Sequence, residues 1–358
     1  MGFKLRGRHA KGGGDADTDR TGVLLVNTGT PEAPTPQAVK KYLSEFLMDP
    51  RIAPMNRVVW WFILHFAILP KRSQASAEKY RAIWTDEGSP LLATHERLAA
   101  GLSDYYRARG SNVVVRFAMS YSKPTISTAI AELAEEGCTS LVVLPLYPQS
   151  AFSTTGAVSD GVARAVRKTR WKGSVTIVDN YHDDPDYVRA IAASIKHAGF
   201  NPDSDDRLMF SFHSIPLVDI EAGDTYELQA GATSLAVASE LGLDRRRWTV
   251  GYQCRFDKGR AWLSPFTRTT LDSWAETGGN ERVFLVCPNF AVDCLETTYD
   301  IAHEIEPGYR ARKREHDGVE PAHDAFTYVP CLNKSKAHLR VLAHVLKPYV
   351  EGAFDDEN

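Results

Sequence analysis

Two short stretches of this sequence each place one proton-active side chain just after an apolar run. The run 208–212 leads directly into His213, and the run 283–288 leads into Glu296. Both runs have the length and composition of buried strands, and groups that follow the carboxyl ends of parallel strands share one crevice. A histidine and a carboxylate that face each other there are able to bind a metal ion and to accept protons from the molecule that the ion enters.

The acidic residues after the second run recur at a helical spacing. Glu296, Asp300 and Glu304 lie four residues apart, so on an α-helix they form one stripe that drifts by about 40° per step. Like charges at this spacing repel unless a cation lies among them, and a path for metal ions or protons supplies that cation. Two plainer interpretations stay open. Asp293 and Glu296 also fit a capping box with the other acids on a solvated face, and His213 also fits a structural role.

Three polar loops are candidates for binding an anionic group. Residues 27–31 and 153–156 follow predicted strands, and residues 87–90 form a turn near Arg81. Hydroxyl and backbone N–H groups in such loops are able to hold a carboxylate, although ordinary turn chemistry explains the same residues. The hydroxyl candidates are Thr28, Ser153 and Thr154. The sequence has neither a phosphate-binding loop nor a dinucleotide fingerprint, so nucleotide binding has no support.

The composition limits the class of protein. With 358 residues, 43% apolar and 24% charged, the chain suits a soluble globular protein of one large or two medium domains. A formal net charge of −3 argues against a general nucleic-acid binder. The five cysteines are odd in number and scattered, which indicates a reducing compartment, so we expect a cytoplasmic protein. Residues 1–20 contain no apolar secretory segment and predict a disordered tail.

One apolar block, residues 58–69, needs separate comment. It is shorter than the roughly 20 residues that a membrane-spanning helix requires. A core helix is one interpretation. Two adjacent tryptophans, with Arg57 before the block and Lys71 and Arg72 after it, equally suit a lip that dips into a membrane interface.

Apolar runs alternate with helical patterns along the whole chain. This alternation predicts an α/β fold with parallel sheets covered by helices on both faces. A strand followed by a turn to proline recurs in each half, which predicts two similar α/β lobes. We place their boundary at the turn-forming residues 199–206. The predicted parts are a tail over 1–20, a first lobe over 21–200, a second lobe over 206–333, and a helix over 334–350 that packs back on the first lobe.

The individual elements follow from the same patterns. The predicted strands cover 23–29, 113–119, 141–148, 174–179, 208–213, 248–253 and 283–288. The predicted helices cover 35–48, 74–83, 92–108, 125–136, 156–168, 185–198, 226–241, 263–277, 293–305 and 334–349.

Seven stretches of the sequence resemble the ferrochelatases in order and spacing. They begin with LLVNTGTP and continue with YRAIWTDEGSPL, LPLYPQSAFSTTGAV, SFHSIP, WLSPFT, DCLETTYDIAHE and YVPCLN. The resemblance covers about residues 22–349. It implies a heme-biosynthetic enzyme, a lyase that inserts Fe²⁺ into a porphyrin and releases two protons. It also implies a chelatase-like fold of two similar doubly wound lobes with parallel sheets, with the porphyrin cleft between them.

The resemblance implies roles for individual residues. His213 and Glu296 become the catalytic residues and the contacts of the metal ion, and Asp300 and Glu304 continue a path for metal ions or protons. Arg81 matches a contact to a porphyrin propionate. The full set implied to bind the porphyrin is Thr28, Arg81, Ser153, Thr154 and Trp262.

The resemblance also bears on cofactor and substrate. Some members carry a [2Fe–2S] cluster bound by one cysteine before the STTG motif and three in a C-terminal tail. Here Phe152 occupies that loop and no cysteine follows Cys331, so we expect no cofactor beyond the substrate Fe²⁺. The apolar lip over 54–70 and Thr28, where coproporphyrin-type members often have tyrosine, favour protoporphyrin IX. The lip further implies peripheral contact through 58–69 with the inner face of a membrane.

Three alternatives remain beside this interpretation. The first is a ferrochelatase that converts coproporphyrin III. The second is a chelatase for another metal and tetrapyrrole, such as cobalt and sirohydrochlorin, although His213 stands without a second motif histidine. The third is a binding protein that holds a tetrapyrrole without chemistry. We expect porphyrin and Fe²⁺ as partners, no nucleic acid, and a monomer or weak dimer.

Overall fold

The computed structural model describes residues 4–5, 20–255, 257, 259–277, 279 and 281–350. The chain divides into two units, each built around its own sheet. The first unit comprises the residues up to Tyr181 and those from Leu339 onward, and the second comprises His182–His338. Helix α13 begins at Lys336, at the end of the second unit, and continues into the first, where Leu339 lies against Gly101.

The two sheets share one strand order. The first sheet has the order β1-β5-β4-β2-β3 and the second has the order β7-β6-β8-β9. In both, the unit's first long strand lies inside the sheet, the next strand pairs on one side of it and the third on the other. All pairs are parallel except β1 with β5. The predicted fold of two similar doubly wound α/β lobes is therefore confirmed, and each unit has a topological switch point at the carboxyl end of its first long strand.

The bounds of the elements are as follows. The strands are β1 (Lys4–Leu5), β2 (Arg20–Asn27), β3 (Val113–Met119), β4 (Cys138–Pro145), β5 (Ser174–Ile177), β6 (Arg207–His213), β7 (Trp248–Gln253), β8 (Val283–Val286) and β9 (Phe326–Val329). The helices are α1 (Pro36–Leu47), α2 (Arg57–Phe62), α3 (Leu69–Ile83), α4 (Pro90–Arg107), α5 (Ile126–Glu135), α6 (Ala157–Thr169), α7 (Pro185–His197), α8 (Leu217–Glu221), α9 (Tyr226–Glu240), α10 (Thr267–Thr277), α11 (Leu295–Asp300), α12 (Glu306–Asp317) and α13 (Lys336–Val350). Three π-helical turns cover Ile63–Ile68, Phe152–Gly156 and Ile301–Ile305.

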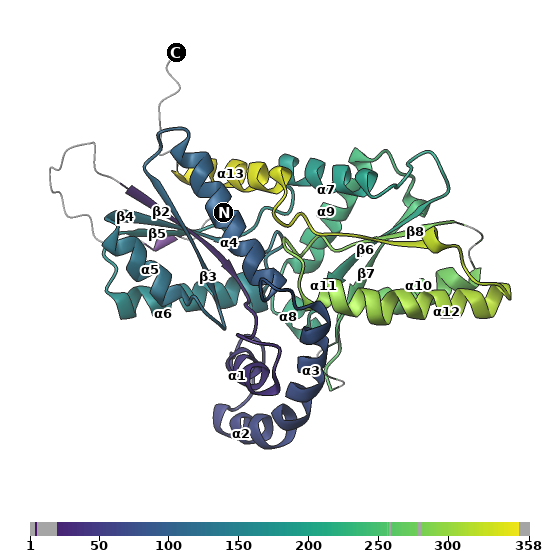
Figure 1. The fold of residues 1–358 in the computed structure, drawn as a ribbon, viewed down its shortest axis with the longest axis horizontal. Coiled ribbons are helices and arrows are strands. Elements are labelled where there is room, and N and C mark those ends of the chain that lie inside the picture. Colours follow the sequence, from purple (N-terminus) through teal and green to yellow (C-terminus); the bar gives the residue numbers. More distant parts are fainter. Residues whose placement is uncertain are drawn as a thin grey trace, which may run out of the picture. The chain divides into compact units, whose positions relative to one another are not determined.

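Helices cover both faces of the first sheet. Successive side chains of a strand point to opposite faces, and Leu24 and Val26 of β2 belong to the core formed with α5 and α6. Val23 and Leu25, also buried, point to the opposite face, where α4 lies (Figure 1). Because both faces of the strand are covered, the centre of β2 is a continuous apolar run, Val23–Val26, as a parallel strand inside a sheet requires.

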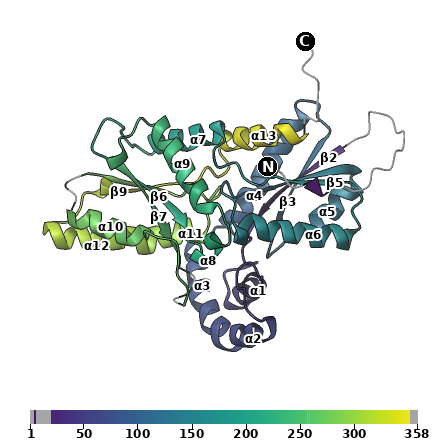
Figure 2. The ribbon, with the colours of Figure 1, turned by 180° about the vertical axis from the view of Figure 1, so that it is seen from behind.

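The second sheet is covered in the same way. Met209 of β6 and Leu285 of β8 join the core formed with α10 and α12. On the other face, Phe212 lies edge-on to Tyr226 of α9, with ring centroids 6.5 Å apart, and Figure 2 shows α9 on this side of the sheet. The fully buried Phe210 lies two residues before Phe212 and points to the same face.

The boundary between the two units differs from the predicted one. The units divide between Tyr181 and His182, so α7 belongs to the second unit rather than the first. The reason is packing, since the Tyr187 hydroxyl of α7 donates to the Pro288 carbonyl and the Thr233 hydroxyl donates to the His182 carbonyl at 2.7 Å.

The sequence analysis also omitted or shortened several elements, among them α8, which it did not predict, and α3, which begins at Leu69 rather than at residue 74. β9 is a further strand, and the helix predicted to end at residue 305 continues as α12. Within the predicted tail, Lys4–Leu5 pair with the edge strand β5, whose outer backbone groups would otherwise lack strand partners. Residues 1–3 and 6–19 of that tail lie outside the described residues.

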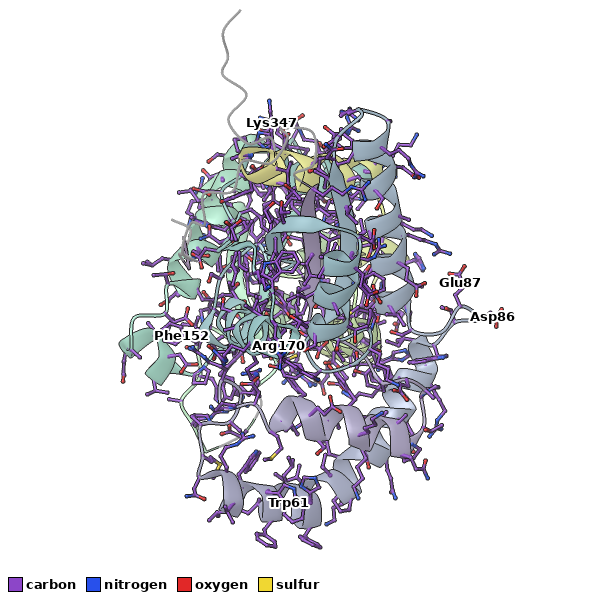
Figure 3. All side chains as sticks on the ribbon, turned by 90° about the vertical axis from the view of Figure 1, so that its left-hand side faces the viewer. Trp61, Asp86, Glu87, Phe152, Arg170 and Lys347 are labelled. Atoms are coloured by element: carbon purple, nitrogen blue, oxygen red, sulfur yellow. The ribbon has the colours of Figure 1, made fainter. Side chains whose placement is uncertain are left out.

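The apolar block folds into helix, and most of its large apolar side chains are exposed. Helices α1, α2 and α3 stand off from the sheet of the first unit (Figure 1). Leu64 and Leu69 are buried, whereas Phe66 is 72% exposed and Trp61 is 41% exposed. Figure 3 marks Trp61 on this segment, at the lower end of the view. No helix in the described part of the chain is long and apolar enough to cross a membrane.

A buried histidine gives the second unit a predicted pH dependence. His338 is fully buried, its Nδ1 hydrogen-bonds to the Asn333 carbonyl at 2.5 Å, and burial lowers its pKa to about 4. In the unfolded chain this pKa is about 6.5, so between the two values the unfolded state binds more protons. We therefore expect the free energy of unfolding to fall as the pH drops from 6.5 toward 4, by about 3 kcal/mol in all from this residue.

Urea unfolding at several pH values between 4.5 and 7.5 tests this expectation. His338→Gln should flatten the slope of stability against pH in this window. His197→Gln, at an exposed position on α7, is the matched control and should leave the slope unchanged. Equal slopes for the two variants would contradict the assignment to His338.

Candidate active site

His213 ends β6 at the carboxyl edge of the second sheet. Its side chain is half-buried, and Nδ1 lies 2.7 Å from the Ser214 carbonyl oxygen. A carbonyl only accepts, so this bond assigns the proton of the neutral ring to Nδ1 and leaves the lone pair on Nε2. Nε2 is therefore the atom able to accept a proton or bind a metal ion, and the carbonyl would stabilise the imidazolium that forms.

The turn after His213 is held by a second segment. The Ser214 hydroxyl donates to the Leu263 carbonyl at 2.8 Å, and the Leu263 N–H donates to the Ile215 carbonyl at 2.9 Å. Between these contacts Trp262 forms a bridge with Pro216, and its ring is only 7% exposed. Its buried Nε1 has no hydrogen-bond partner among the described residues. The predicted site residue Trp262 thus supports the His213 turn, with one donor left for a water molecule or a ligand.

The helix that carries the acidic residues begins at Leu295, with Cys294 as its N-cap. The Thr297 hydroxyl, not the Glu296 carboxylate, accepts the Cys294 N–H at 2.9 Å, so the predicted capping box of Asp293 and Glu296 is wrong. Glu296 lies in the first turn, where the positive end of the helix favours a negative charge. Its carboxylate is therefore not used for capping.

Asp293 anchors the start of this helix. Its Oδ1 accepts from the Tyr328 hydroxyl at 2.6 Å and from the Thr297 hydroxyl at 3.0 Å, and its Oδ2 accepts from Asn333 Nδ2 at 2.6 Å. The Asn333 Oδ1 in turn accepts the Asp293 N–H at 2.9 Å. A carboxylate with this many donors is held in one orientation, which fixes the first turn of α11 against β9.

The π-helical turn changes the geometry of the acidic stripe. Glu296 and Asp300 are separated by α-helix, whereas the step from Asp300 to Glu304 crosses the π turn Ile301–Ile305. A step of four residues is longer than one α-helical turn but shorter than one turn of the wider π-helix. The step from Glu296 to Asp300 therefore rotates around the helix axis in one direction, and the step from Asp300 to Glu304 rotates in the other. The stripe is therefore straighter than the predicted drift of about 40° per step. Glu296 and Asp300 are half-buried and Glu304 is exposed, so the stripe leads to solvent.

Two residues that the sequence analysis missed connect β7 to this helix. Gln253 pairs with His213 across β6 and β7, and its Nε2 donates to the Glu296 carbonyl at 3.4 Å. The next residue, Cys254, has its Sγ 3.7 Å from Asp300 Oδ2. His213, Glu296 and Asp300 are thus brought to one edge of one sheet. The sequence feature that could have identified Gln253 and Cys254 is their position at the end of the predicted strand 248–253.

The thiols beside the carboxylates remain protonated. Burial, reinforced by Glu296 and Asp300, raises the pKa of Cys254 well above its usual range. Burial followed by the charge of Glu296 does the same to the pKa of Cys294. Thiols in this state act as weak donors to the carboxylates rather than as thiolate ligands. In the described part of the chain, no group of three or more His, Cys, Asp or Glu side chains is arranged to hold a metal ion.

The polar loops of the first unit also meet at one sheet edge. Thr28 follows β2, and its hydroxyl lies 2.5 Å from the Tyr147 hydroxyl, which follows β4. The Ser89 hydroxyl donates to Thr30 Oγ1 at 2.8 Å, which joins the predicted turn 87–90 to the loop 27–31. Gly29 has φ +115°, and an added Cβ would lie 2.5 Å from the Ser122 hydroxyl oxygen, so this tight turn requires glycine.

The remaining predicted residues of this unit have different surroundings. Thr154 Oγ1 accepts the Ala151 N–H at 3.1 Å and also contacts the Ala151 carbonyl, so its hydroxyl stabilises the turn in which it lies. Ser153 is half-buried in the same π turn. Arg81 is exposed in the last turn of α3, and among the described residues its Nε donates to the Pro34 carbonyl at 3.4 Å. Arg81 therefore has donors available for an anionic ligand.

Two matching parallel α/β units, one with a histidine and an acidic helix at its sheet edge, define a chelatase-like protein. Among solved structures, the chain is similar to SirB from Bacillus subtilis with Fe³⁺, with a TM-score of 0.57 and 12% identity over 94% of this chain and 99% of that one. The cobalt complex of the sirohydrochlorin chelatase SirB from Bacillus subtilis subspecies spizizenii gives a TM-score of 0.51 and 13% identity, also over 94% and 99%. At these identities the likeness concerns the fold alone.

Sequence comparison is more specific. The ferrochelatase family model matches residues 20–349. The ferrochelatase of Aromatoleum aromaticum is 42% identical over 92% of this chain and 87% of its own length, and that of Nitrosococcus oceani is 39% identical over 93% and 88%. The chain belongs to the ferrochelatase family.

Proposed function

We propose that protoporphyrin IX is the preferred substrate of this chain, which inserts Fe²⁺ into a porphyrin, and that His213 and Glu296 perform the chemistry. The observation that carries the proposal is the hydrogen-bonded arrangement around Gln253, which joins the His213 strand end to the Glu296 helix. The proposal also rests on membership of the ferrochelatase family.

The proton balance assigns a task to His213. A free porphyrin carries two inner N–H protons, and both must leave as Fe²⁺ loses its water ligands and enters the ring. His213 Nε2 has the lone pair and accepts the first proton, while the Nδ1–H bond to Ser214 stabilises the resulting imidazolium. The same lone pair also suits contact with the metal ion, so the two roles share one atom.

The acidic residues Glu296, Asp300 and Glu304 account for the second proton and for delivery of the metal ion. Glu296 contacts the incoming Fe²⁺ or accepts the second proton, and Asp300 and Glu304 pass ions between this position and solvent. Three acids in a straight row attract a divalent cation without holding it in a closed cage, which suits an ion that has to move on. The products are the metalloporphyrin and two protons.

Residues of the first unit are proposed to hold the porphyrin. Exposed Arg81 suits a propionate because a guanidinium binds a carboxylate through two parallel hydrogen bonds. Thr28 and Ser153 supply hydroxyl groups, and Thr154 contributes through the shape of its turn. In the second unit Trp262 supports the turn that carries His213.

Anaerobic turnover with Fe²⁺ tests the proposal, with protoporphyrin IX and coproporphyrin III offered separately and the porphyrin spectrum followed. Faster metallation of protoporphyrin IX supports the proposed substrate. Preference for coproporphyrin III would keep the chemistry and change the substrate. Tight binding of both without metallation would indicate the non-catalytic binding protein instead.

We also propose that the exposed apolar segment of α2 and its π turn contacts a membrane surface. Its outward residues are large and apolar, namely Met55, Val58, Val59, Trp61, Phe62, Ile63 and Phe66. An apolar patch of this kind with Arg57 and Lys71 at its ends suits an anionic bilayer interface. Trp60 does not share this role, because its Nε1 donates to the Leu47 carbonyl of α1 at 2.7 Å.

The membrane proposal predicts a specific loss of binding. Replacing Trp61 and Phe66 by serine should weaken binding to anionic phosphatidylglycerol vesicles about tenfold or more, since each large apolar side chain contributes about 1.5–3 kcal/mol when buried. Vesicle co-sedimentation measures the effect. Leu228→Ser, at a 75% exposed position on α9, is the control and should bind as the unmodified chain does. Equal binding by all three proteins would exclude this segment as the contact.

Three further expectations stay predictions. The position of Phe152 and the lack of cysteines after Cys331 predict no [2Fe–2S] cluster, which the absorbance spectrum of the purified protein tests. A monomer or weak dimer is expected, and analytical centrifugation measures it. The cytoplasmic location, peripheral at the inner face of a membrane, depends on the proposed lip.

A further inference from the structure

The segment that follows β7 touches the acidic helix at two successive turns. Gln253 Nε2 reaches the Glu296 carbonyl at 3.4 Å, and Cys254 Sγ reaches Asp300 Oδ2 at 3.7 Å. Glu296 and Asp300 are one helical turn apart, so the adjacent residues Gln253 and Cys254 contact two successive acidic residues of the stripe. Cys254 makes its contact to Asp300 from a left-handed backbone conformation, φ +61°, which is rare for a residue other than glycine.

Gln253 is fixed on its other side as well. It is 5% exposed, and its Oε1 accepts from the Ser211 hydroxyl at 2.9 Å. Ser211 Oγ also lies 2.8 Å from the Thr267 hydroxyl. Because Ser211 has one proton, which it gives to Gln253, Thr267 has to donate to Ser211. The amide orientation follows, with its N–H group directed at the helix.

The same residue is tied to the strand that carries His213. Gln253 is the register partner of His213, and its carbonyl accepts the Ser214 N–H at 2.8 Å. Gln253 therefore contacts both catalytic elements while neither its amide nor its backbone is proposed to contact the substrate. A shift of its side chain would change the distance between the His213 strand end and the Glu296 helix.

We propose that Gln253 and Cys254 are positioning residues that hold the acidic stripe in register with His213 during metal insertion. This inference rests on the roles proposed for His213 and Glu296. A misplacement of about 1 Å at a reacting group costs up to about a hundredfold in rate. The loss should fall on turnover and not on porphyrin affinity, because neither residue is proposed to contact the macrocycle.

Steady-state kinetics of single variants tests the proposal. Gln253→Met keeps the size of the side chain and removes its donor, and we expect kcat to fall about tenfold to a hundredfold with the porphyrin KM unchanged. Gln229→Met is the matched control, since Gln229 is a similarly buried glutamine of the same unit, on α9, whose Nε2 donates to the hydroxyl of the N-cap residue Thr225. Its kcat should stay near that of the unmodified enzyme. Equal kcat for the two variants, or a rise in the porphyrin KM alone, would overturn the proposal.

Cys254 provides an independent pair of variants that does not depend on the folding of Gln253→Met. Cys254→Ala removes the donor and should lower kcat severalfold, whereas Cys254→Ser keeps a donor and should restore most of it. A merely structural role for the thiol would affect both variants alike and would appear in the melting temperature instead. Equal turnover of the alanine and serine variants would overturn the assignment for Cys254.

His213→Ala and Glu296→Gln, assayed beside these variants, distinguish the positioning role of Gln253 from the catalytic roles proposed for His213 and Glu296. If both lose turnover while Gln253→Met does not, the positioning role is wrong and the proposed function stands. If both turn over normally, the proposed roles of His213 and Glu296 are wrong, and the positioning role falls with them.

Discussion

Replacement of His213 by alanine is expected to reduce Fe²⁺ insertion about 10²- to 10⁴-fold, the range in which a positioned general base contributes. The reason is the lone pair on Nε2, which the Nδ1 bond to Ser214 at 2.7 Å directs away from the backbone. Porphyrin affinity should change little, because the macrocycle offers many other contacts. Anaerobic kcat measurements combined with an absorbance titration of the porphyrin separate the two effects.

Asparagine at this position gives a sharper comparison than alanine. The side-chain amide of His213→Asn is able to retain the donor to the Ser214 carbonyl, but it has no group at the position of Nε2. We therefore expect His213→Asn to keep the local fold and to be as inactive as His213→Ala. His197→Ala, at an exposed position in the same unit, is the control and should be fully active. Substantial turnover by His213→Asn would mean that the ring contributes through its hydrogen bond alone.

The strands of this fold could be predicted from the sequence because their burial leaves a simple pattern. β2 and β6 are covered on both faces, so each contains an uninterrupted apolar run, Val23–Val26 in β2 and Leu208–Phe210 in β6, and that run marks the strand. β9 escaped prediction because its four residues are few and only half of them are buried. His213 and Glu296 could be placed at a common edge for the same reason, since each follows a recognisable run.

The helix ends could not be predicted, and two prolines explain why. Pro307 looks like a helix stop, since proline lacks an N–H group and its ring collides with the carbonyl four residues earlier. In the structure, Pro70 and Pro307 each stand two residues after a π turn, and the helix continues past both. A π turn directs its bonds to the fifth residue back, which moves the obstructing carbonyl and makes the missing N–H tolerable. Local patterns of single residues do not show this arrangement.

The hydrogen bonds of the site could not be predicted from the sequence either. The capping box of Asp293 and Glu296 was a sound expectation from spacing, yet Asp293 instead binds Tyr328 and Asn333, residues at least 35 positions away. Gln253 and Cys254 act through contacts of the same long-range kind. Such pairs depend on the register of one strand against another, and no local spacing carries that information.

The second large effect is expected from Glu296→Gln, which keeps the size of the side chain and removes its charge. Since Thr297 caps the helix, the glutamine should not disturb the first turn of α11. We expect kcat to fall about a hundredfold or more, because this change removes both an acceptor for the second proton and a contact for Fe²⁺. Anaerobic kinetics with varied Fe²⁺ distinguishes the two tasks, since loss of a metal contact raises the KM for Fe²⁺, whereas loss of a proton acceptor lowers kcat at saturating Fe²⁺.

A graded series along the stripe tests whether Glu296 acts with its neighbours. Asp300→Asn should lower turnover less than Glu296→Gln does, because Asp300 lies one helical turn farther from the proposed reaction. Glu304→Gln should lower turnover less again, because Glu304 is exposed and water weakens the effect of its charge. Glu315→Gln, at an exposed position on α12, should have no effect and serves as the control. A path for ions requires this order, since the residue nearest the reacting atoms is irreplaceable while solvent is able to substitute for the outermost one. If Glu304→Gln were as damaging as Glu296→Gln, the stripe would not end in open solvent as proposed, and entry of the metal ion at Glu304 would become the slow step.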